Sequence, residues 1–536
     1  MTETQVADII EITPALKAEL RELHGIYKLL TDETLLRARW PNLAEAGIHP
    51  VYVGEGENRK LRGVRLGTRA TPAESGSVCL HAMIHTNEPS GLAGLQSALH
   101  WWDELSKAQK DAVPGDVYLL FTGEHQQADK YFERILNGPD TIRLEEATVF
   151  RKTSDGKTDR NRLPFEEPGD SAAASAKALW RDHQELESTV FSKCGTPKEG
   201  ENPGFIIGFH SLTLPGPVTA LISLEPVPNG PEKPGIVSRI TDYVKPLSAM
   251  CGAELIVVET HNDVHNPFFE SCLKRNAEPG KESITTGTVI PLTLECGRHL
   301  DPKSIQAAKN AAMNALEYKF GPELVRGAER PQSRTVDITY NTQVWSPPAS
   351  PDAERNNPKK NKEFLAPPLR TGEAYGTIHF IKGMAITDAE KLSKDIAKPS
   401  WLSHLSDREW EMVRDTPATW KAVSNAKPNQ LGNGAKLAEG QPFALVDIKD
   451  ATGTTVRFDL LRAPVAGICL MFSRDPVPCA APGDYVLICE CNQATVELPA
   501  QANMGNGAWT KDRKRLSADV IAASGQTRPH TPHRLG

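Results

Sequence analysis

Two kinds of apolar pattern alternate along the chain. In one kind, apolar residues recur every three or four positions, as on one face of a helix; this pattern covers residues 13–47, 92–105, 172–187 and 303–316. In the other kind, apolar residues dominate short runs of strand length, at residues 78–84, 115–122, 205–209, 218–224, 254–259 and 288–296. Such runs are typical of strands that are covered on both faces. Strands separated by helical stretches predict an α/β fold with helices on either side of a sheet.

The stretch from residue 78 to residue 95 joins a strand to a helix through a polar turn. Val78–Ile84 is apolar enough for a buried strand, and Pro89 suits the first turn of the helix that follows. Between them, His85 and Glu88 place an imidazole and a carboxylate three positions apart. Ligands bind at the C-terminal ends of strands in α/β sheets, and two histidines with one glutamate form a catalytic zinc site. A surface turn with a capping glutamate is the alternative, because a single H-x-x-E pair recurs by chance in long chains.

Two further strand ends carry polar side chains that could complete such a site. His210 follows the apolar run 205–209, where it is either a third ligand or a structural histidine. Glu295 lies near the end of the run 288–296, a place that suits a general base beside a metal-bound water. The alternative for Glu295 is a charge at the N-terminus of the helix that starts near Asp301.

Other polar residues have weaker patterns. Asn161 and Arg162 could clamp a substrate carboxylate, since a guanidinium binds carboxylates in bidentate fashion, or they could lie in a solvated basic loop. His261 and His265 lie among Asn, Asp and Pro residues, which predicts a loop away from the site. His81 lies within a predicted strand and is expected in the core or beside the ligands.

Composition and charge narrow the functional class. The 536 residues suffice for two or more domains, and the shares of 39% apolar and 24% charged residues are ordinary for globular proteins. A net charge of −7 gives no reason to expect a nucleic-acid partner. The acidic start lacks the pattern of a signal peptide, and no apolar run is long enough to span a membrane. Nine cysteines without a CxxC pair argue against disulfides and thiolate zinc sites, so a cytoplasmic protein is expected.

The patterns divide the chain into five parts. Residues 1–45 are expected to form an N-terminal helical segment and 46–325 a catalytic domain. Residues 326–375 are rich in Pro, Asn, Lys and Arg, which predicts a linker or an extended excursion. Short alternating strands around an Ala-Pro-x-x-Gly turn predict a mainly-β domain over 376–505, and the basic tail 506–536 is expected to be disordered.

Four short motifs follow one another in the chain: HTNE at 85–88, DRNR at 159–162, HS at 210–211 and ECG at 295–297. Their order resembles the succinylglutamate desuccinylase/aspartoacylase family, a branch of the zinc carboxypeptidase fold with the signatures G-x-H-G-N-E, D-L-N-R-x-F, H-S/T and E-x-G. The resemblance covers about residues 50–320. It implies a zinc carboxypeptidase-like mixed sheet flanked by helices, followed by a lipoyl-like barrel-sandwich appendage. The chain departs from the signatures at Thr86 and Arg160, where the family has Gly and Leu.

The resemblance also implies a metal centre. His85, Glu88 and His210 would hold one Zn²⁺ per chain and leave one position open for water. Bound zinc lowers the pKa of that water from ~15.7 to about 7. Glu295 would take the proton as the water attacks an amide carbonyl, and would return it to the leaving nitrogen.

Charged side chains around the metal would bind the substrate. The family uses an arginine upstream of the Asn-Arg pair to stabilise the oxyanion. Arg151 and Arg143 are both candidates here, and Arg151 is preferred. Asn161 and Arg162 would grip the carboxylate of the substrate.

These assignments predict a zinc-dependent hydrolase that cleaves the amide bond of an N-acyl amino acid or a similar small carboxylated amide. A zinc metallocarboxypeptidase acting on peptides is the alternative, because a peptide also presents a carboxylate. A binding protein that kept the fold without catalysis is the third candidate. The expected partner is a small molecule, with no nucleic acid and no membrane, and assembly into homo-oligomers is left open.

Overall fold

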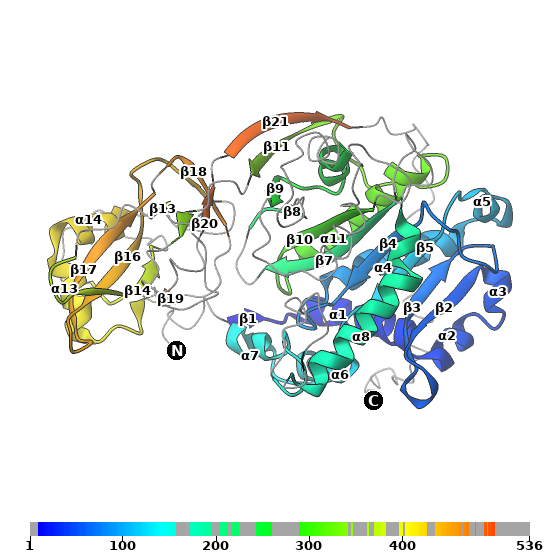
Figure 1. Cartoon of the computed structure of the whole chain (residues 1–536), viewed down its shortest axis with the longest axis horizontal. Coiled ribbons are helices and arrows are strands. Elements are labelled where there is room, and N and C mark those ends of the chain that lie inside the picture. The colour runs from blue at the N-terminus through cyan, green and yellow to red at the C-terminus, as the bar shows by residue number, and fades with distance from the viewer. Residues whose placement is uncertain are drawn as a thin grey trace, which may run out of the picture.

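The computed structural model shows a mixed α/β chain in which most helices gather around one large sheet (Figure 1). A smaller β-rich part stands beside that sheet (Figure 1). The structure describes residues 9–156, 169, 172–195, 204–212, 216–223, 243–259, 289–340, 345–346, 362–363, 369–381, 396–399, 402–425, 435–463, 465–470, 477–478, 487–489 and 491–498.

A ten-stranded mixed sheet forms the centre of the larger part. Its strands lie in the order β2 (Ile48–Val53), β3 (Lys60–Leu66), β5 (Val117–Phe121), β4 (Val78–Ala82), β7 (Phe205–Leu212), β10 (Ile290–Arg298), β8 (Thr219–Ser223), β9 (Leu255–Glu259), β11 (Ser333–Tyr340) and β21 (Cys491–Glu497). The neighbours β5, β4, β7 and β10 run parallel to one another. Their C-terminal ends therefore meet at one edge of the sheet, and the predicted mixed sheet with helices is confirmed.

Helices flank this sheet. They are α1 (Pro14–Thr31), α2 (Glu33–Arg39), α3 (Leu43–Ala46), α4 (Ser90–Glu104), α5 (Lys107–Ala112), α6 (His125–Asn137), α7 (Leu144–Val149), α8 (Ala174–Thr189) and α11 (Pro302–Phe320). Thr13 begins α1 by accepting a hydrogen bond from the N–H of Leu16, at 3.2 Å. The apolar side of α1 packs on α4, α6 and the strands β3 and β5. A short strand before it, β1 (Ile9–Glu11), pairs with β6 (Thr141–Arg143).

Successive side chains along each strand point to opposite faces of the sheet. Leu80 of β4 and Phe209 of β7 belong to the core shared with α1, α4 and α11. Ile206 belongs to a second core on the opposite face, together with residues of α8 and of the turn at 191–194. His210 and Glu295 each follow a residue of the first core, so both side chains start from the second face.

Two glycines let α4 lie close to its neighbours. A β-carbon on Gly91 would lie 2.6 Å from the Cβ of Phe209, and one on Gly94 would lie 3.0 Å from the carbonyl oxygen of Ala308 in α11. Larger residues at these two positions would push α4 away from β7 and α11. The close approach places the turn before α4 next to the end of β7.

The sheet extends beyond the domain division expected from the sequence. β11 lies within 326–375, where a linker or an extended excursion was expected, and it pairs with β9 and β21. Val336 and Ile338 of β11 alternate with polar residues and are buried in the main core. The polar composition of the surrounding residues hides this short alternation. β21, expected in the C-terminal domain, likewise completes the edge of the large sheet.

In the C-terminal part, the described residues form two small sheets and two helices. One small sheet contains β13 (Lys362–Glu363), β12 (Trp345–Ser346), β20 (Leu487–Cys489), β18 (Gly467–Leu470) and β15 (Ala435–Leu437). A second contains β17 (Thr455–Arg462), β16 (Pro442–Lys449), β14 (Ala374–Phe380) and β19 (Val477–Pro478). Two helices, α13 (Asp407–Asp415) and α14 (Pro417–Asn425), pack against β17. Among the described residues, no helix combines the length and apolar character that crossing a membrane requires.

Candidate metal centre

The turn between β4 and α4 carries two of the predicted ligands. β4 ends at Ala82, and Met83 takes a left-handed backbone conformation with φ of 59°, which turns the chain out of the strand. α4 then begins with Pro89 as its N-cap residue, without a side-chain capping bond. Glu88 does not cap this helix, since its carboxylate bonds elsewhere and the residue is only 2% exposed. The expected alternative of an exposed capped turn is therefore wrong.

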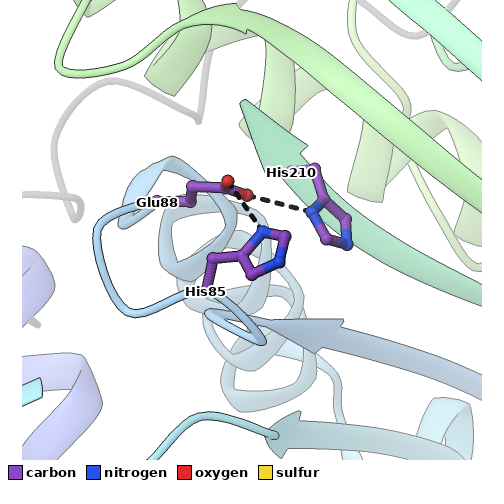
Figure 2. Close-up of side chains that lie close together, drawn as sticks. All are labelled: His85, Glu88 and His210. Carbon is purple, nitrogen blue, oxygen red and sulfur yellow. Dashed lines mark hydrogen bonds and ion pairs between the residues drawn. The ribbon is translucent and has the colours of Figure 1, made fainter. Parts of the chain in front are cut away.

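Three buried side chains converge beside this turn. Nδ1 of His85 lies 2.9 Å from Oε1 of Glu88, and Nδ1 of His210 lies 2.9 Å from Oε2 of the same carboxylate. Figure 2 shows the carboxylate facing both rings, with His210 reaching it from the end of β7. The two imidazole rings lie nearly edge to face, with centroids 5.1 Å apart.

The donor set fits a zinc ion. One nitrogen from each of His85 and His210 and one oxygen from Glu88 lie within 4.8 Å of one another. Two histidines with one glutamate form a set that catalytic zinc sites use, with the fourth position open. Burial raises the pKa of Glu88, but the attraction of His85 and His210 outweighs it and holds the pKa well below its usual range. The group is therefore an anion between two nitrogen donors, which is the arrangement a divalent cation stabilises.

Glu295 lies next to His210 in the sheet. The two residues are register partners on the parallel strands β10 and β7. Burial raises the pKa of Glu295 to about 7 in the metal-free protein, although the charges of His210 and Arg151 act against that rise. Among the described residues, neither Oε2 of Glu295 nor Nε2 of His210 has a hydrogen-bond partner, although both atoms are buried. Such orphaned polar atoms are expected where an ion, water or substrate binds.

The strand β10 has a bulge directly after Glu295. The pairing of β10 with β7 shifts between Glu295 and Arg298, and Gly297 within the shift has φ of 117°. A β-carbon at Gly297 would lie 2.7 Å from Oγ of Ser304 in α11. The N-cap of α11 is Asp301, whose side chain accepts the N–H of Lys303 at 2.8 Å. Glu295 therefore does not serve as the helix N-terminal charge, which was its alternative reading.

Two further residues lie beside the ligands: Ser211, the second residue of the HS motif, and His299, which the sequence did not indicate. The backbone N–H of Ser211 donates to Oε2 of Glu88 at 3.2 Å, and Oγ of Ser211 lies 2.8 Å from Nδ1 of His299. Burial lowers the pKa of His299 to about 4, with Arg151 among the charges that add to this effect. His299 is thus a neutral, buried neighbour of the site. Its position one residue after the bulge is the only sequence signal for it, and that signal is weak.

The two candidate arginines occupy different places. Arg143 is an exposed residue at the end of β6, where it pairs with Ile9 of β1. Arg151 is partly buried, and its charge acts on the pKa of Glu295. This difference favours Arg151 as the cation near the site. Asn161 and Arg162, expected to bind a carboxylate, lie outside the described residues, as do His261 and His265.

His81 lies in the core, as expected. Its Nδ1 lies 3.2 Å from Oγ1 of Thr122, and its ring covers the backbone of Gly208 in β7. Burial lowers its pKa to about 3, so the ring is neutral. His81 is absent from the group of residues that could hold a metal in the described part of the chain.

Comparison with known proteins gives distant likenesses only. No family model matches the sequence, and no curated protein matches it. Several structural neighbours are succinylglutamate desuccinylase/aspartoacylase family proteins.

Three solved structures illustrate these likenesses. A protein assigned to that family from Shewanella amazonensis has 10% identity and a TM-score of 0.45, over 83% of this chain and 100% of its own. A succinylglutamate desuccinylase/aspartoacylase from Rhodobacter sphaeroides has 13% identity and a TM-score of 0.41, over 83% and 94%. The ectoine utilization protein EutE (DoeB) from Ruegeria pomeroyi has 12% identity and a TM-score of 0.39, over 84% and 95%. Identities and TM-scores this low support no argument about function, so any functional argument must rest on the side chains of this chain.

Proposed function

We propose that this protein is a zinc-dependent hydrolase that cleaves the amide bond of an N-acyl amino acid or a similar small carboxylated amide. The observation that carries the proposal is the convergence of His85, Glu88 and His210, with Glu295 as the register partner of His210. A buried donor set next to a buried carboxyl group offers both a place for a metal and a group that exchanges protons. A purely structural metal site would need no such carboxyl group.

Each side chain has a definable task in this reaction. When bound, Zn²⁺ supplies Lewis-acid chemistry, which makes water acidic near neutral pH and polarises a carbonyl oxygen. His85, Glu88 and His210 would hold the ion. Glu295 accepts the proton that the attacking water loses and passes it to the leaving nitrogen, as a general base and acid does.

The substrate class rests on Arg151 and on the motif resemblance. Arg151 would stabilise the negative charge that develops on the carbonyl oxygen. Asn161 and Arg162 would bind the substrate carboxylate, because an amide and a guanidinium fork match its geometry. A small acid with an acylated amino group has both the amide carbonyl and the carboxylate that these residues would bind.

Metal analysis together with kinetics tests the proposal. Purified wild-type protein should contain one zinc per chain by mass spectrometry and should hydrolyse at least one member of a panel of N-acyl amino acids. Glu295→Gln should keep the zinc and lose activity by about 10²–10⁴-fold, the usual contribution of a general base. Glu254→Gln is the matched control, because it makes the same change at an exposed residue next to β9.

The outcome also separates the rival functions. Cleavage of C-terminal residues from peptides, without action on N-acyl amino acids, would indicate a carboxypeptidase. A wild-type protein without zinc that is as inert as Glu295→Gln would exclude a hydrolase at this site.

A further inference from the structure

Thr86 links the metal-binding turn to a second segment of the chain. Its side-chain hydroxyl donates a hydrogen bond to the backbone carbonyl of Phe150. Thr86 is only 1% exposed and lies directly after the ligand His85. The carbonyl of Phe150 belongs to the same peptide unit as the N–H of Arg151. The hydroxyl therefore holds the peptide unit that joins Phe150 to Arg151.

Further hydrogen bonds hold the chain after Arg151. Nε2 of the buried Gln127 donates to the carbonyl oxygens of Lys152 and Thr153, each at 3.2 Å. Ser154 bonds to Glu124 through its backbone N–H at 2.8 Å and through its hydroxyl at 2.7 Å. Gln127 and Glu124 lie at the start of α6, so this helix end anchors residues 152–154.

A third contact joins the same two segments. The hydroxyl of the buried Tyr131 donates to the carbonyl oxygen of Asn87 at 3.2 Å. The ring of Tyr131 also packs edge-on against Phe150, with centroids 5.3 Å apart. Thr86 and Tyr131 thus each connect the turn 85–88 with Phe150.

The charge of Arg151 acts on two groups beside the metal-binding turn, Glu295 and His299. Burial is the main influence on the pKa of Glu295 and of His299, and the guanidinium of Arg151 lowers the pKa of both groups. An arginine has several rotatable bonds, so an anchored backbone limits where its guanidinium can lie. A hydroxyl at Thr86 is not required to form the metal site, since His85 and Glu88 bond to each other directly.

We propose that Thr86 is a positioning residue: its bond to the Phe150 carbonyl sets the distance between the metal-binding turn and Arg151, so that the guanidinium faces an oxyanion at the metal. The proposal rests on the proposed function, since it assigns Arg151 to oxyanion stabilisation. The simpler alternative is that the hydroxyl only satisfies a buried carbonyl group. In that case its loss would lower stability without affecting Arg151.

A double-mutant cycle with inorganic phosphate as the anion tests this coupling. Phosphate affinity of the zinc-loaded protein is measured by titration calorimetry for wild type, Thr86→Val, Thr86→Ser, Arg151→Ala and the Thr86→Val/Arg151→Ala double variant. Thr86→Val has nearly the same shape without the hydroxyl and should weaken phosphate binding by about five- to tenfold. Thr86→Ser keeps the hydroxyl and should remain within twofold of wild type. In the Arg151→Ala background, Thr86→Val should have no further effect.

A second measurement needs neither zinc nor hydrolysis. Phenylglyoxal modifies accessible guanidinium groups, and peptide mass spectrometry follows its reaction with Arg151 in the metal-free protein. Thr86→Val should raise the rate at Arg151 by at least about threefold, because Phe150, the residue before Arg151, loses its hydrogen bond to the metal-binding turn. Thr86→Ser should leave the rate unchanged.

The two measurements separate this proposal from the proposed function. Coupled phosphate binding in a protein that hydrolyses nothing on the panel would support the positioning role and count against the hydrolase. Independent effects of Thr86→Val and Arg151→Ala on phosphate, or an unchanged phenylglyoxal rate in Thr86→Val, would overturn the positioning role. The same holds if zinc-loaded wild type and Arg151→Ala bind phosphate equally.

Discussion

Glu295 and His210 lie side by side on two adjacent parallel strands, as register partners near the C-terminal ends of β10 and β7. The pairing brings a carboxyl group with a pKa near neutral next to a histidine that bonds to Glu88. The ligand and the proposed base therefore come from adjacent strands of one sheet, so their spacing depends on strand pairing and not on a loop. Rigid elements hold catalytic groups more accurately than loops do.

The pKa of Glu295 predicts how the metal-free protein responds to pH. The carboxyl group has its pKa raised from 4.5 to about 7 on folding, mainly by burial. Between these values the folded state binds more protons than the unfolded state, so this group's contribution to stability is lost as the pH rises through about 7. Glu295→Gln cannot ionise and should match wild type near pH 4.5 and exceed it at pH 8, by at most about 3 kcal/mol.

Urea denaturation of both metal-free proteins between pH 4.5 and pH 8 measures this difference. The exposed Glu254→Gln is again the matched control and should show no such trend. A constant difference between Glu295→Gln and wild type at every pH would show that the carboxyl group is not buried in the way described.

Removal of a ligand should weaken zinc binding strongly. Glu88→Gln removes the charge that lies between His85 and His210 and should weaken zinc affinity by at least about 100-fold, the upper end of what outer-sphere partners contribute. His210→Ala should have a similar effect. The control His49→Ala changes a histidine of the same sheet that bonds to the carbonyl of Gly67, and should bind zinc as wild type does.

Zinc should also stabilise the folded chain. At a free concentration 1,000 times its Kd, a bound ligand adds about 4 kcal/mol to the free energy of unfolding. A chelator should therefore lower the thermal transition of wild type and leave that of Glu88→Gln unchanged. Equal sensitivity of both proteins to the chelator would place the zinc elsewhere.

The close contact between His81 and Gly208 gives a prediction about the core below the site. A β-carbon at Gly208 would lie 2.6 Å from Nε2 of His81, whose ring is held on its other side by Thr122. Gly208→Ala should therefore destabilise the protein by about 1–3 kcal/mol. Combining it with His81→Ala should cost less than the sum of the two single changes, because the smaller side chain makes room. Chemical denaturation of the four proteins gives the coupling, and strict additivity would contradict the contact.

The sequence was sufficient to predict the parallel strands β4, β5, β7 and β10 and three residues that meet beside them. Val78–Ile84 and the run 205–209 are apolar on both faces, and that pattern is strong because a parallel strand has no solvent side. His85, Glu88 and His210 could then be predicted together because strand ends meet at one edge.

Tertiary contacts decided the features that the sequence did not indicate. β11 was hidden because only Val336 and Ile338 mark its buried side, within a long polar stretch. The bond from Thr86 to Phe150 joins residues 64 positions apart, and no local pattern reports such a contact. The same is true of Ser211 and His299, which are 88 positions apart and meet where β7 and β10 pair.

The contact between Ser211 and His299 should affect the stability of the fold but not the affinity for zinc. Ser211→Ala removes the hydroxyl that lies 2.8 Å from the buried Nδ1 of His299, which should cost about 1–3 kcal/mol of stability. The bond to Oε2 of Glu88 comes from the backbone N–H of Ser211 and survives the change. Zinc affinity should therefore stay within about threefold of wild type while the denaturation midpoint falls. A zinc competition titration beside urea denaturation measures both, and a tenfold loss of zinc affinity would mean that the Ser211 hydroxyl orients the ligands.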